Sequence, residues 1–175
     1  MLELALLNAD ELRHIFIREV TKETNKYYWM ENFFDYEFII EPNEWRRIQY
    51  VSKDSEGRIL VYFGAWINRS FNIVERLEIF NLSGKPNVIA TRDFIRFLEI
   101  LFCQRQFRKV VFYVIKDNPA VKLYEKFIVD NKIGKIVGVF EKQCISTDGN
   151  CYDQIIFEMY KDNFVEWFNN VYKKI

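Results

Sequence analysis

The stretch KDNPAVKLYEKFIVDNKIGKIVGVFE, from Lys116 to Glu141, contains the pattern that decides the fold. Asn118 and Pro119 predict a helix start, because the Asn side chain can accept a hydrogen bond from a first-turn amide and Pro has a preset φ. The apolar residues that follow have helical spacing: Ala120, Leu123, Tyr124, Phe127 and Ile128. Tyr124 therefore lies on or beside the buried stripe, where its hydroxyl requires a partner. That partner is either a buried carbonyl oxygen or a ligand.

The composition predicts a single domain over residues 1–175. Of the 175 residues, 50% are hydrophobic and 18% are aromatic, which is enough to bury a sizeable core. Lys plus Arg and Asp plus Glu both total 25, so the net charge is zero. Because a duplex nucleic-acid binder usually has a basic excess, we expect no nucleic-acid partner.

The N-terminal stretch MLELALLNADEL has no basic region and is interrupted by Glu3 and Asp10. This argues against a signal peptide and against a membrane span, so we expect a cytoplasmic protein without a membrane partner.

The cysteines are Cys103, Cys144 and Cys151, an odd number that indicates reduced thiols rather than a disulfide framework. Cys144 and Cys151 flank a turn and are expected to face each other across a hairpin. The chain has one His and no Cys-x-x-Cys pair, so we expect no metal site.

Helices are predicted at the start of the chain. The first is predicted within residues 8–22, where Asn8 is the expected N-cap and Glu11 follows three residues later. The apolar face of this helix consists of Leu12, Ile15, Phe16 and Val20. The aromatic residues 25–40 are expected to be partly helical and to end before Pro42, which disfavours helix at the preceding residue.

Three antiparallel strands are predicted next. Residues 47–67 contain two runs rich in Ile, Val and Tyr around the turn KDSEG, which indicates a hairpin. Residues 72–82 add a third strand and complete a meander. A strongly amphipathic helix within residues 92–107 should then lie against the sheet.

The second half of the chain alternates strands and helices. Residues 109–115, KVVFYVI, form a nearly continuous apolar run, so the strand Val110 to Ile115 should be among the most buried. Residues 135–145 and 152–160 are joined through STDGN, whose Asp-Gly supplies a hairpin turn. A short helix is expected at 163–175.

This order of elements resembles the GNAT family of N-acetyltransferases over roughly residues 2–159. The most specific match is the segment around Asn118, Ala120, Leu123 and Tyr124, which is similar to a family helix followed by a Gly-containing strand. The resemblance implies an α/β (α+β) fold: a mixed twisted sheet with an antiparallel meander, a central parallel pairing and helices on both faces. It also implies transfer of an acetyl group from acetyl-CoA to an amine of a small molecule, peptide or protein.

The resemblance assigns roles to single residues. In the family, this helix lies beside bound acetyl-CoA, so Asn118 would contact it and Tyr124 would stand near its thioester sulfur and protonate the departing thiolate. Glu78, on the third meander strand, resembles the Glu that some members use as base. By position, the remaining contacts to acetyl-CoA fall on Leu82, Ser83, Gly84, Lys85, Ala90, Thr91 and Ala120. An outward-facing strand residue in a salt bridge is the alternative interpretation of Glu78.

The loop SGKPNVIATRDF, residues 83–94, departs from the family pattern Gln/Arg-x-x-Gly-x-Gly/Ala, whose glycines let amides approach a pyrophosphate. Lys85 and the hydroxyls of Ser83 and Thr91 can replace some of those contacts, so we expect weaker binding of acetyl-CoA. The departure favours a second hypothesis, a GNAT-like scaffold that has lost acetyl transfer and binds another protein. In a third hypothesis, the chain is an unrelated α/β protein and Tyr124 is one of its core residues.

The acceptor site would be lined by residues 27–38, of which seven of twelve are aromatic, and by residues 145–153. This wall can hold an apolar amine, or it is ordinary core or the surface of a homodimer. Glu31, Asp35 and Asp153 can attract a cationic amine.

Overall fold

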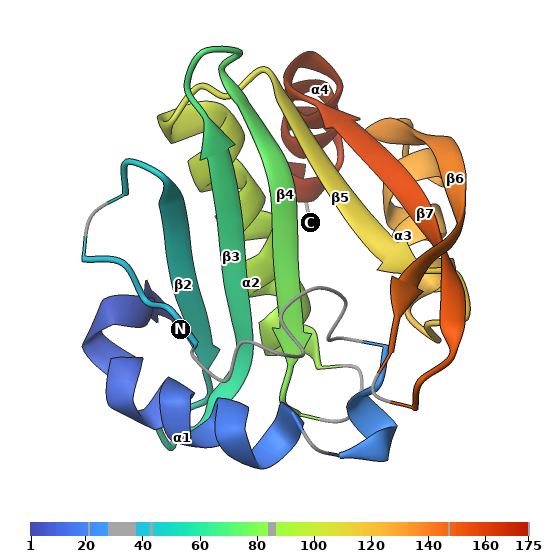
Figure 1. Cartoon of the computed structure of the whole chain (residues 1–175). Coiled ribbons are helices and arrows are strands. Elements are labelled where there is room, and N and C mark those ends of the chain that lie inside the picture. Colours follow the sequence, from blue (N-terminus) through green and yellow to red (C-terminus); the bar gives the residue numbers. More distant parts are fainter. Residues whose placement is uncertain (21, 28–37, 43, 84–86, 147, 175) are drawn as a thin grey trace.

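The computed structural model describes residues 1–175 except 21, 28–37, 43, 84–86, 147 and 175 (Figure 1). Its centre is a seven-stranded sheet in the order β1-β2-β3-β4-β5-β7-β6. The strands are β1 Leu2–Leu4, β2 Arg47–Lys53, β3 Ile59–Asn68, β4 Ile73–Asn81, β5 Lys109–Ile115, β6 Gly134–Ile145 and β7 Cys151–Tyr160. β4 and β5 are parallel and the other neighbouring pairs are antiparallel, which confirms the predicted mixed sheet.

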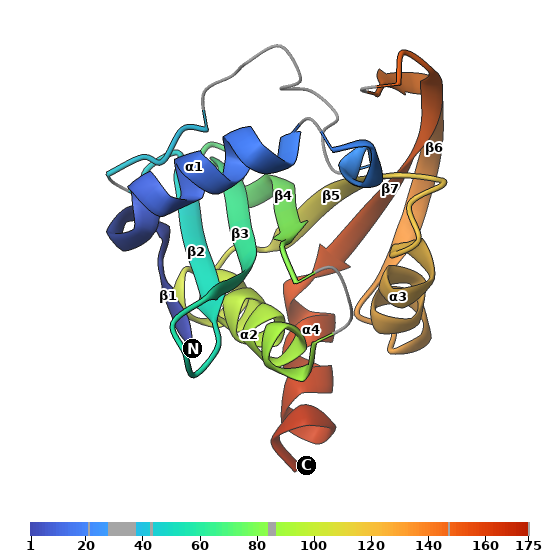
Figure 2. The same ribbon diagram turned by 90° about the horizontal axis from the view of Figure 1, so that it is seen from below.

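Helices cover both faces of the sheet. They are α1 Ala9–Val20, α2 Val88–Glu99, α3 Val121–Glu125 and α4 Lys161–Asn170. α1 lies on one face, and α2, α3 and α4 lie on the other (Figure 2). α2 and α3 each continue into a π-helical turn, Ile100–Gln104 and Lys126–Asp130, and three short 3-10 turns complete the elements: Ala5–Asn8, Glu23–Asn25 and Tyr172–Lys174.

Several helix starts differ from the prediction. α2 begins at Val88 rather than within 92–107, because Asn87 caps it, and α4 begins at Lys161 rather than at 163. α3 begins at Val121, because Asn118 and Ala120 first form a turn in which the Asn118 side chain accepts a hydrogen bond from the Ala120 amide at 2.9 Å. Asn8 lies in a 3-10 turn, where its side chain donates to the Leu4 carbonyl. The expected helix within residues 25–40 falls largely on residues 28–37, outside the described part of the chain.

The core has a cluster on each face of the sheet. One contains Phe63, Phe97, Phe102, Phe112 and Phe157 and lies on the side of α2, α3 and α4. The other lies under α1 and contains Leu12, Phe16, Val51, Tyr62 and Phe80. β5 lies between β4 and β7 with both of its faces largely buried, as the run Val110 to Ile115 predicted.

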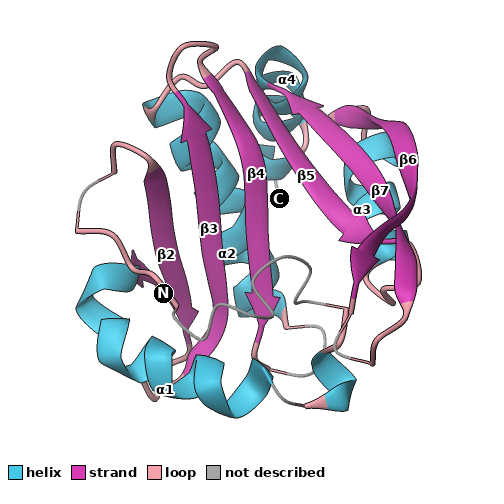
Figure 3. Ribbon diagram, viewed as in Figure 1, coloured by secondary structure: helices cyan, strands magenta, loops and turns pink. Residues whose placement is uncertain are grey.

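The parallel pair β4–β5 is short. Its register pairs are Ile73 with Lys109 and Val74 with Val110, and beyond them the two strands diverge (Figure 3). Main-chain groups of both strands past these pairs therefore face a gap in the hydrogen-bonded ladder.

The two outer strands of the sheet differ in length and character. β1 has three residues, and its Glu3 forms an ion pair with Lys53 at 3.2 Å. β6 has twelve residues, and its apolar side chains are 39–58% exposed: Ile136, Val137, Val139, Phe140 and Ile145. β6 thus presents a long apolar edge, whereas β1 presents a short charged one.

Cys103, Cys144 and Cys151 form no disulfide with one another. The expectation that Cys144 and Cys151 face each other is wrong, since Cys144 pairs with Tyr152 and Cys151 pairs with Ile145. Within the described residues, no helix is long and apolar enough to cross a membrane.

Candidate functional site

Tyr124 lies on α3, beside the end of β5. Its ring packs edge-on against Phe112 with centroids 5.0 Å apart, and against Phe157 at 6.4 Å. Phe112 and Phe157 are themselves stacked at 5.1 Å on neighbouring strands. The ring of Tyr124 is therefore fixed by two buried aromatic residues while the residue remains partly exposed.

Asn118 holds the turn between β5 and α3. Besides accepting from Ala120, its side-chain amide donates to the main-chain carbonyl of Tyr27 at 3.5 Å. Asn118 is buried, so this contact ties the start of α3 to the segment that follows α1. The structure thus joins a predicted cofactor residue to the start of the predicted acceptor wall.

An ion pair, which we call the Lys26–Asp148 clasp, joins the segment that follows α1 to the loop between β6 and β7. Lys26 Nζ lies 3.1 Å from Asp148 Oδ2, and the Tyr152 hydroxyl donates to this carboxylate at 2.6 Å. The Ser146 hydroxyl donates to the Lys26 carbonyl at 2.6 Å. The Tyr152 and Asn150 hydrogen bonds hold the pKa of Asp148 well below its usual range, and Asp148 raises the pKa of Lys26.

Glu78 lies in a polar network on the α1 face of the sheet. Its Oε2 accepts from Arg47 Nη2 at 2.7 Å and from the Tyr62 hydroxyl at 3.2 Å. Its Oε1 accepts from Trp66 Nε1 at 2.7 Å. Gln49 donates to the Tyr62 hydroxyl at 2.8 Å, which extends the network across β2, β3 and β4. Burial, and then the charge of Glu78, raise the pKa of Tyr62.

Arg47 is the buried cation of this network. Its side chain is 5% exposed, and the guanidinium stacks on the Trp66 ring at 4.2 Å from the centroid. Its Nε is buried and has no hydrogen-bond partner among the described residues. The alternative interpretation of Glu78 required an ion pair, and Glu78 forms one with Arg47. The Glu78 side chain is only 20% exposed, however, so it faces the protein rather than solvent.

Gly64 provides the space for this network. It pairs with Gln49 on one side and Glu78 on the other. A Cβ at this position would lie 2.4 Å from Glu78 Oε2 and 2.6 Å from the Tyr62 hydroxyl. Only a residue without a side chain lets the carboxylate lie across the strand here.

Glu78 and Tyr124 lie on opposite faces of the sheet. Tyr124 packs with the cluster under α2, α3 and α4, whereas Glu78 belongs to the network around Tyr62 under α1. Between the two residues, the hydrogen-bonded ladder of the sheet is interrupted where β4 and β5 diverge. A substrate that uses both residues must therefore reach them between β4 and β5.

The N-terminus of α2, where a pyrophosphate was expected, is capped by its own chain. Asn87 Oδ1 accepts from the amides of Ile89 at 2.8 Å and Ala90 at 3.3 Å. The Thr91 amide and hydroxyl both donate to the Asn87 carbonyl. An anion that binds these amides must displace the Asn87 carboxamide.

The end of β4 is also engaged internally. The amides of Leu82 and Ser83 both donate to the Leu60 carbonyl, at 2.8 and 3.1 Å, and the Ser83 hydroxyl donates to Asn81 Oδ1 at 2.7 Å. Gly84 and Lys85 lie outside the described residues, as do Glu31 and Asp35.

Asp153, proposed as an attractor of cationic amines, accepts from the Lys142 amide at 3.0 Å and pairs with Lys116 at 3.3 Å. The Lys142 amide and then Lys116 hold its pKa below the usual range. Among the described residues, no group of three or more His, Cys, Asp or Glu side chains is placed to hold a metal ion.

No protein-family model matches the sequence, and no curated protein sequence matches it significantly. Solved structures of spermidine N-acetyltransferase from Vibrio cholerae do match. One, in complex with CoA and spermine, has a TM-score of 0.72 at 17% identity and covers 94% of this chain and 97% of that chain. Another, in complex with manganese ions, has a TM-score of 0.66 at 16% identity and covers 95% of each chain.

The chain has the GNAT fold. The resemblance inferred from the sequence is thereby confirmed at the level of the fold. A dodecameric structure of the Vibrio cholerae enzyme also matches, with a TM-score of 0.60 at 17% identity over 70% of this chain and 69% of that chain.

Sequence reasoning missed Arg47, Gln49, Tyr62 and Trp66 as parts of the site. The alternation of Arg47 and Gln49 within an otherwise apolar strand was the available signal, because it places both side chains on one face.

Proposed function

We propose that this chain is an acyl-CoA-dependent N-acetyltransferase that moves the acetyl group of acetyl-CoA to an amine of a small molecule, peptide or protein. The observation that carries the proposal is the divergence of β4 and β5 beside Tyr124 in a GNAT fold. It leaves a gap between a phenol on one face and a carboxylate on the other. A structure with this fold has been solved with CoA and spermine bound.

The residues around the gap fit acetyl-CoA in part. The turn at Asn118 and Ala120 and the ring of Tyr124 would lie along the thioester end, and the start of α2 would supply partial positive charge to the pyrophosphate. Asn87 must rotate away for its amides to bind the phosphates. When bound, acetyl-CoA supplies the activated acetyl group.

Tyr124 and Glu78 would move the protons of the reaction. As the amine nitrogen forms its bond to the acetyl carbon, the carbon–sulfur bond breaks and the amine loses a proton. Glu78 would accept that proton, directly or through water, and the Tyr124 hydroxyl would donate one to the departing sulfur. Arg47 and Trp66 hold Glu78 in place for this role.

The acceptor would enter over the segment after α1 and the β6–β7 loop, which the Lys26–Asp148 clasp holds together. Polyamines are the first acceptors to test, because the structurally similar enzymes are spermidine N-acetyltransferases. Assembly into a homo-oligomer is part of the proposal, since one similar structure is dodecameric. A cytoplasmic location stays a prediction.

The self-capped start of α2 favours a second candidate function. If Asn87 keeps the Ile89 and Ala90 amides, the pyrophosphate lacks part of its binding site, and the chain would be a protein-binding module with a GNAT fold.

Titration calorimetry with CoA separates the two functions. The enzyme predicts heat of binding and a raised melting temperature, because ligand that binds only the folded state stabilises it by mass action. Acetyl transfer is then measured with spermidine, amino-acid amides and N-terminal peptides. Neither heat nor a thermal shift at millimolar CoA would contradict the enzyme and favour the module.

A further inference from the structure

Three loops meet at one end of the sheet. They are residues 44–46 before β2, 69–72 between β3 and β4, and 104–108 before β5. The latter two lie at the top of Figure 1, whereas β4 ends and α2 begins at the bottom, so they are remote from the expected acetyl-CoA site.

Arginine side chains hold these loops together. Arg69 donates to the carbonyls of Trp45 at 3.1 Å and Glu44 at 2.7 Å, and Arg105 forms an ion pair with Glu44. Arg108 donates to the Phe71 carbonyl at 2.8 Å. The three loops therefore form one continuous surface. We call it the arginine platform and define it by Trp45, Arg46, Arg69, Phe71, Arg105 and Arg108.

The platform has a local excess of positive charge. Its three loops contain four Arg and one acidic residue, Glu44, although the whole chain is neutral. Arg69 and Arg108 are fixed by neutral carbonyl oxygens, which orient a guanidinium without compensating its charge. Each guanidinium keeps further N–H donors for an anion, and the fork of donors suits a phosphate.

Two large aromatic rings stand on the same surface. Trp45 is 67% exposed and Phe71 is 62% exposed. The Arg69 guanidinium lies 5.2 Å from the centroid of the Trp45 ring, so it supports the indole without burying it. Exposed rings held beside fixed cations are the arrangement on which successive nucleobases stack.

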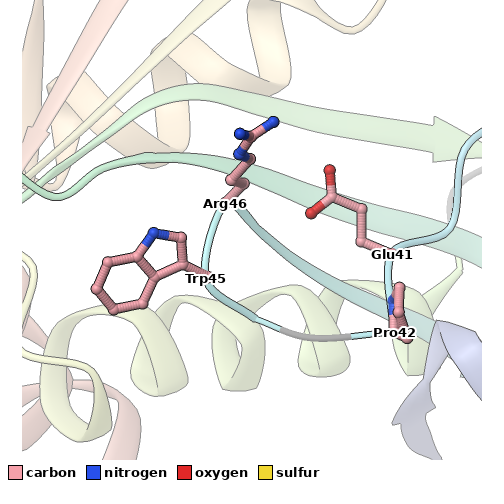
Figure 4. A pocket seen from close by; sticks show the side chains of 4 residues that line it. All are labelled: Glu41, Pro42, Trp45 and Arg46. Atoms are coloured by element: carbon pink, nitrogen blue, oxygen red, sulfur yellow. The ribbon is translucent and has the colours of Figure 1, made fainter.

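A pocket of about 530 Å³ opens beside Trp45 and is lined by Glu41, Pro42, Trp45 and Arg46. Glu41 and Arg46 extend their charged groups on the same side of the loop (Figure 4). The Glu41 carboxylate repels phosphates and carboxylates alike, but it can accept a hydrogen bond from an exocyclic amino group of a base. The pocket therefore suits a neutral base rather than an acidic side chain.

We propose that the arginine platform binds single-stranded nucleic acid, with phosphates on the arginines and bases stacked on Trp45 and Phe71. The expectation of no nucleic-acid partner rested on the net charge of the whole chain, which hides this local excess. The proposal does not depend on acetyl transfer, because the platform is remote from the expected acetyl-CoA site.

Fluorescence anisotropy of the full chain with a labelled 15-nucleotide oligocytidylate, whose bases each carry an exocyclic amino group, tests the platform. We expect a Kd on the order of 10 μM at low salt. For about three phosphate contacts, log K should fall with log salt with a slope of about −2. Absence of binding at a protein concentration of about 100 μM and low salt would overturn the proposal.

Matched variants locate the binding surface. Arg46→Ala with Arg108→Ala should weaken binding at least tenfold and reduce the salt slope by about 1. Trp45→Ala should weaken binding about tenfold with little change of slope. The control, Arg13→Ala with Arg18→Ala, removes two exposed cations from α1 and should bind like wild type. Platform variants that fold and bind like wild type would overturn the proposal, as would oligoglutamate binding as tightly as oligocytidylate.

Discussion

The two halves of the sheet that meet at the β4–β5 pair hold their candidate residues in different ways. On the β5 side, Tyr124 is fixed by apolar contact with Phe112 and Phe157. On the β4 side, Glu78 is fixed by hydrogen bonds from Arg47, Tyr62 and Trp66. The ring contacts in the first arrangement do not depend on a polar atom, whereas the second arrangement does, because a buried charge without its partner is costly. Substitutions in the two halves should therefore separate catalysis from stability.

Arg47→Met should give the largest change. It removes the guanidinium 2.7 Å from Glu78 Oε2 and leaves this partly buried carboxylate with only the longer ion pair to Arg76 at 3.5 Å, so the free energy of unfolding should fall by about 3 kcal/mol. Urea melts measure this. The control is Arg18→Met, whose exposed ion pair with Glu19 on α1 should contribute about 0.5 kcal/mol or less. If the two variants lose equal stability, Arg47 does not hold the network together.

Tyr124→Phe should act on turnover rather than stability. The ring keeps its contacts with Phe112 and Phe157, while loss of the acid should lower the rate of acetyl transfer roughly 10²-fold. CoA binding, measured by calorimetry, should be unchanged. Tyr113→Phe, on the neighbouring strand β5, is the control and should retain full turnover. Unchanged turnover of Tyr124→Phe together with a stability loss of about 1 kcal/mol would assign the hydroxyl to a structural hydrogen bond instead.

Gly64→Ala tests whether the β4 side is as tightly packed as its contacts indicate. The new Cβ would collide with Glu78 Oε2 and the Tyr62 hydroxyl, and such overpacking should cost about 2 kcal/mol. Gly138→Ala in β6 is the matched control, because its Cβ would meet no atom within 4 Å. Its stability in the same melts should change by no more than about 0.5 kcal/mol. Equal effects at the two glycines would refute the packing argument.

Asn87→Gly should have the smallest effect on stability, a few tenths of a kcal/mol, because Gly is a tolerated cap. It frees the amides of Ile89 and Ala90 from the Asn87 carboxamide. Calorimetry should therefore show CoA binding several-fold more tightly than to wild type. Unchanged affinity would mean that the pyrophosphate does not use the start of α2.

Much of the fold was predictable because it depends on local patterns. The apolar run of β5, the Asp-Gly hairpin between β6 and β7, and the amphipathic face of α1 each lie within a few consecutive residues. β1 was missed, since three residues beside a helix give no periodic signal. The late start of α3 was missed because Asn118 caps a turn rather than the helix.

The candidate site was predictable only for residues carried by a motif. Tyr124 and Asn118 came from one continuous segment, and the structure places both beside the end of β5. The contacts of Glu78 depend on the register of three strands, which places Arg47 opposite Trp66 and Gln49 opposite Gly64. Register is set by packing between distant residues, so a single sequence does not show it.

The long outer edge of β6 has a consequence for how the protein behaves in concentrated solution. A free strand of twelve residues with apolar side chains is a template on which another extended chain can add. Lys135 and Lys142 lie within the strand, but the residues between them include no Lys or Pro to discourage such addition. Precipitation on storage and yield on expression should therefore depend on this strand, far more than on any residue that handles a substrate.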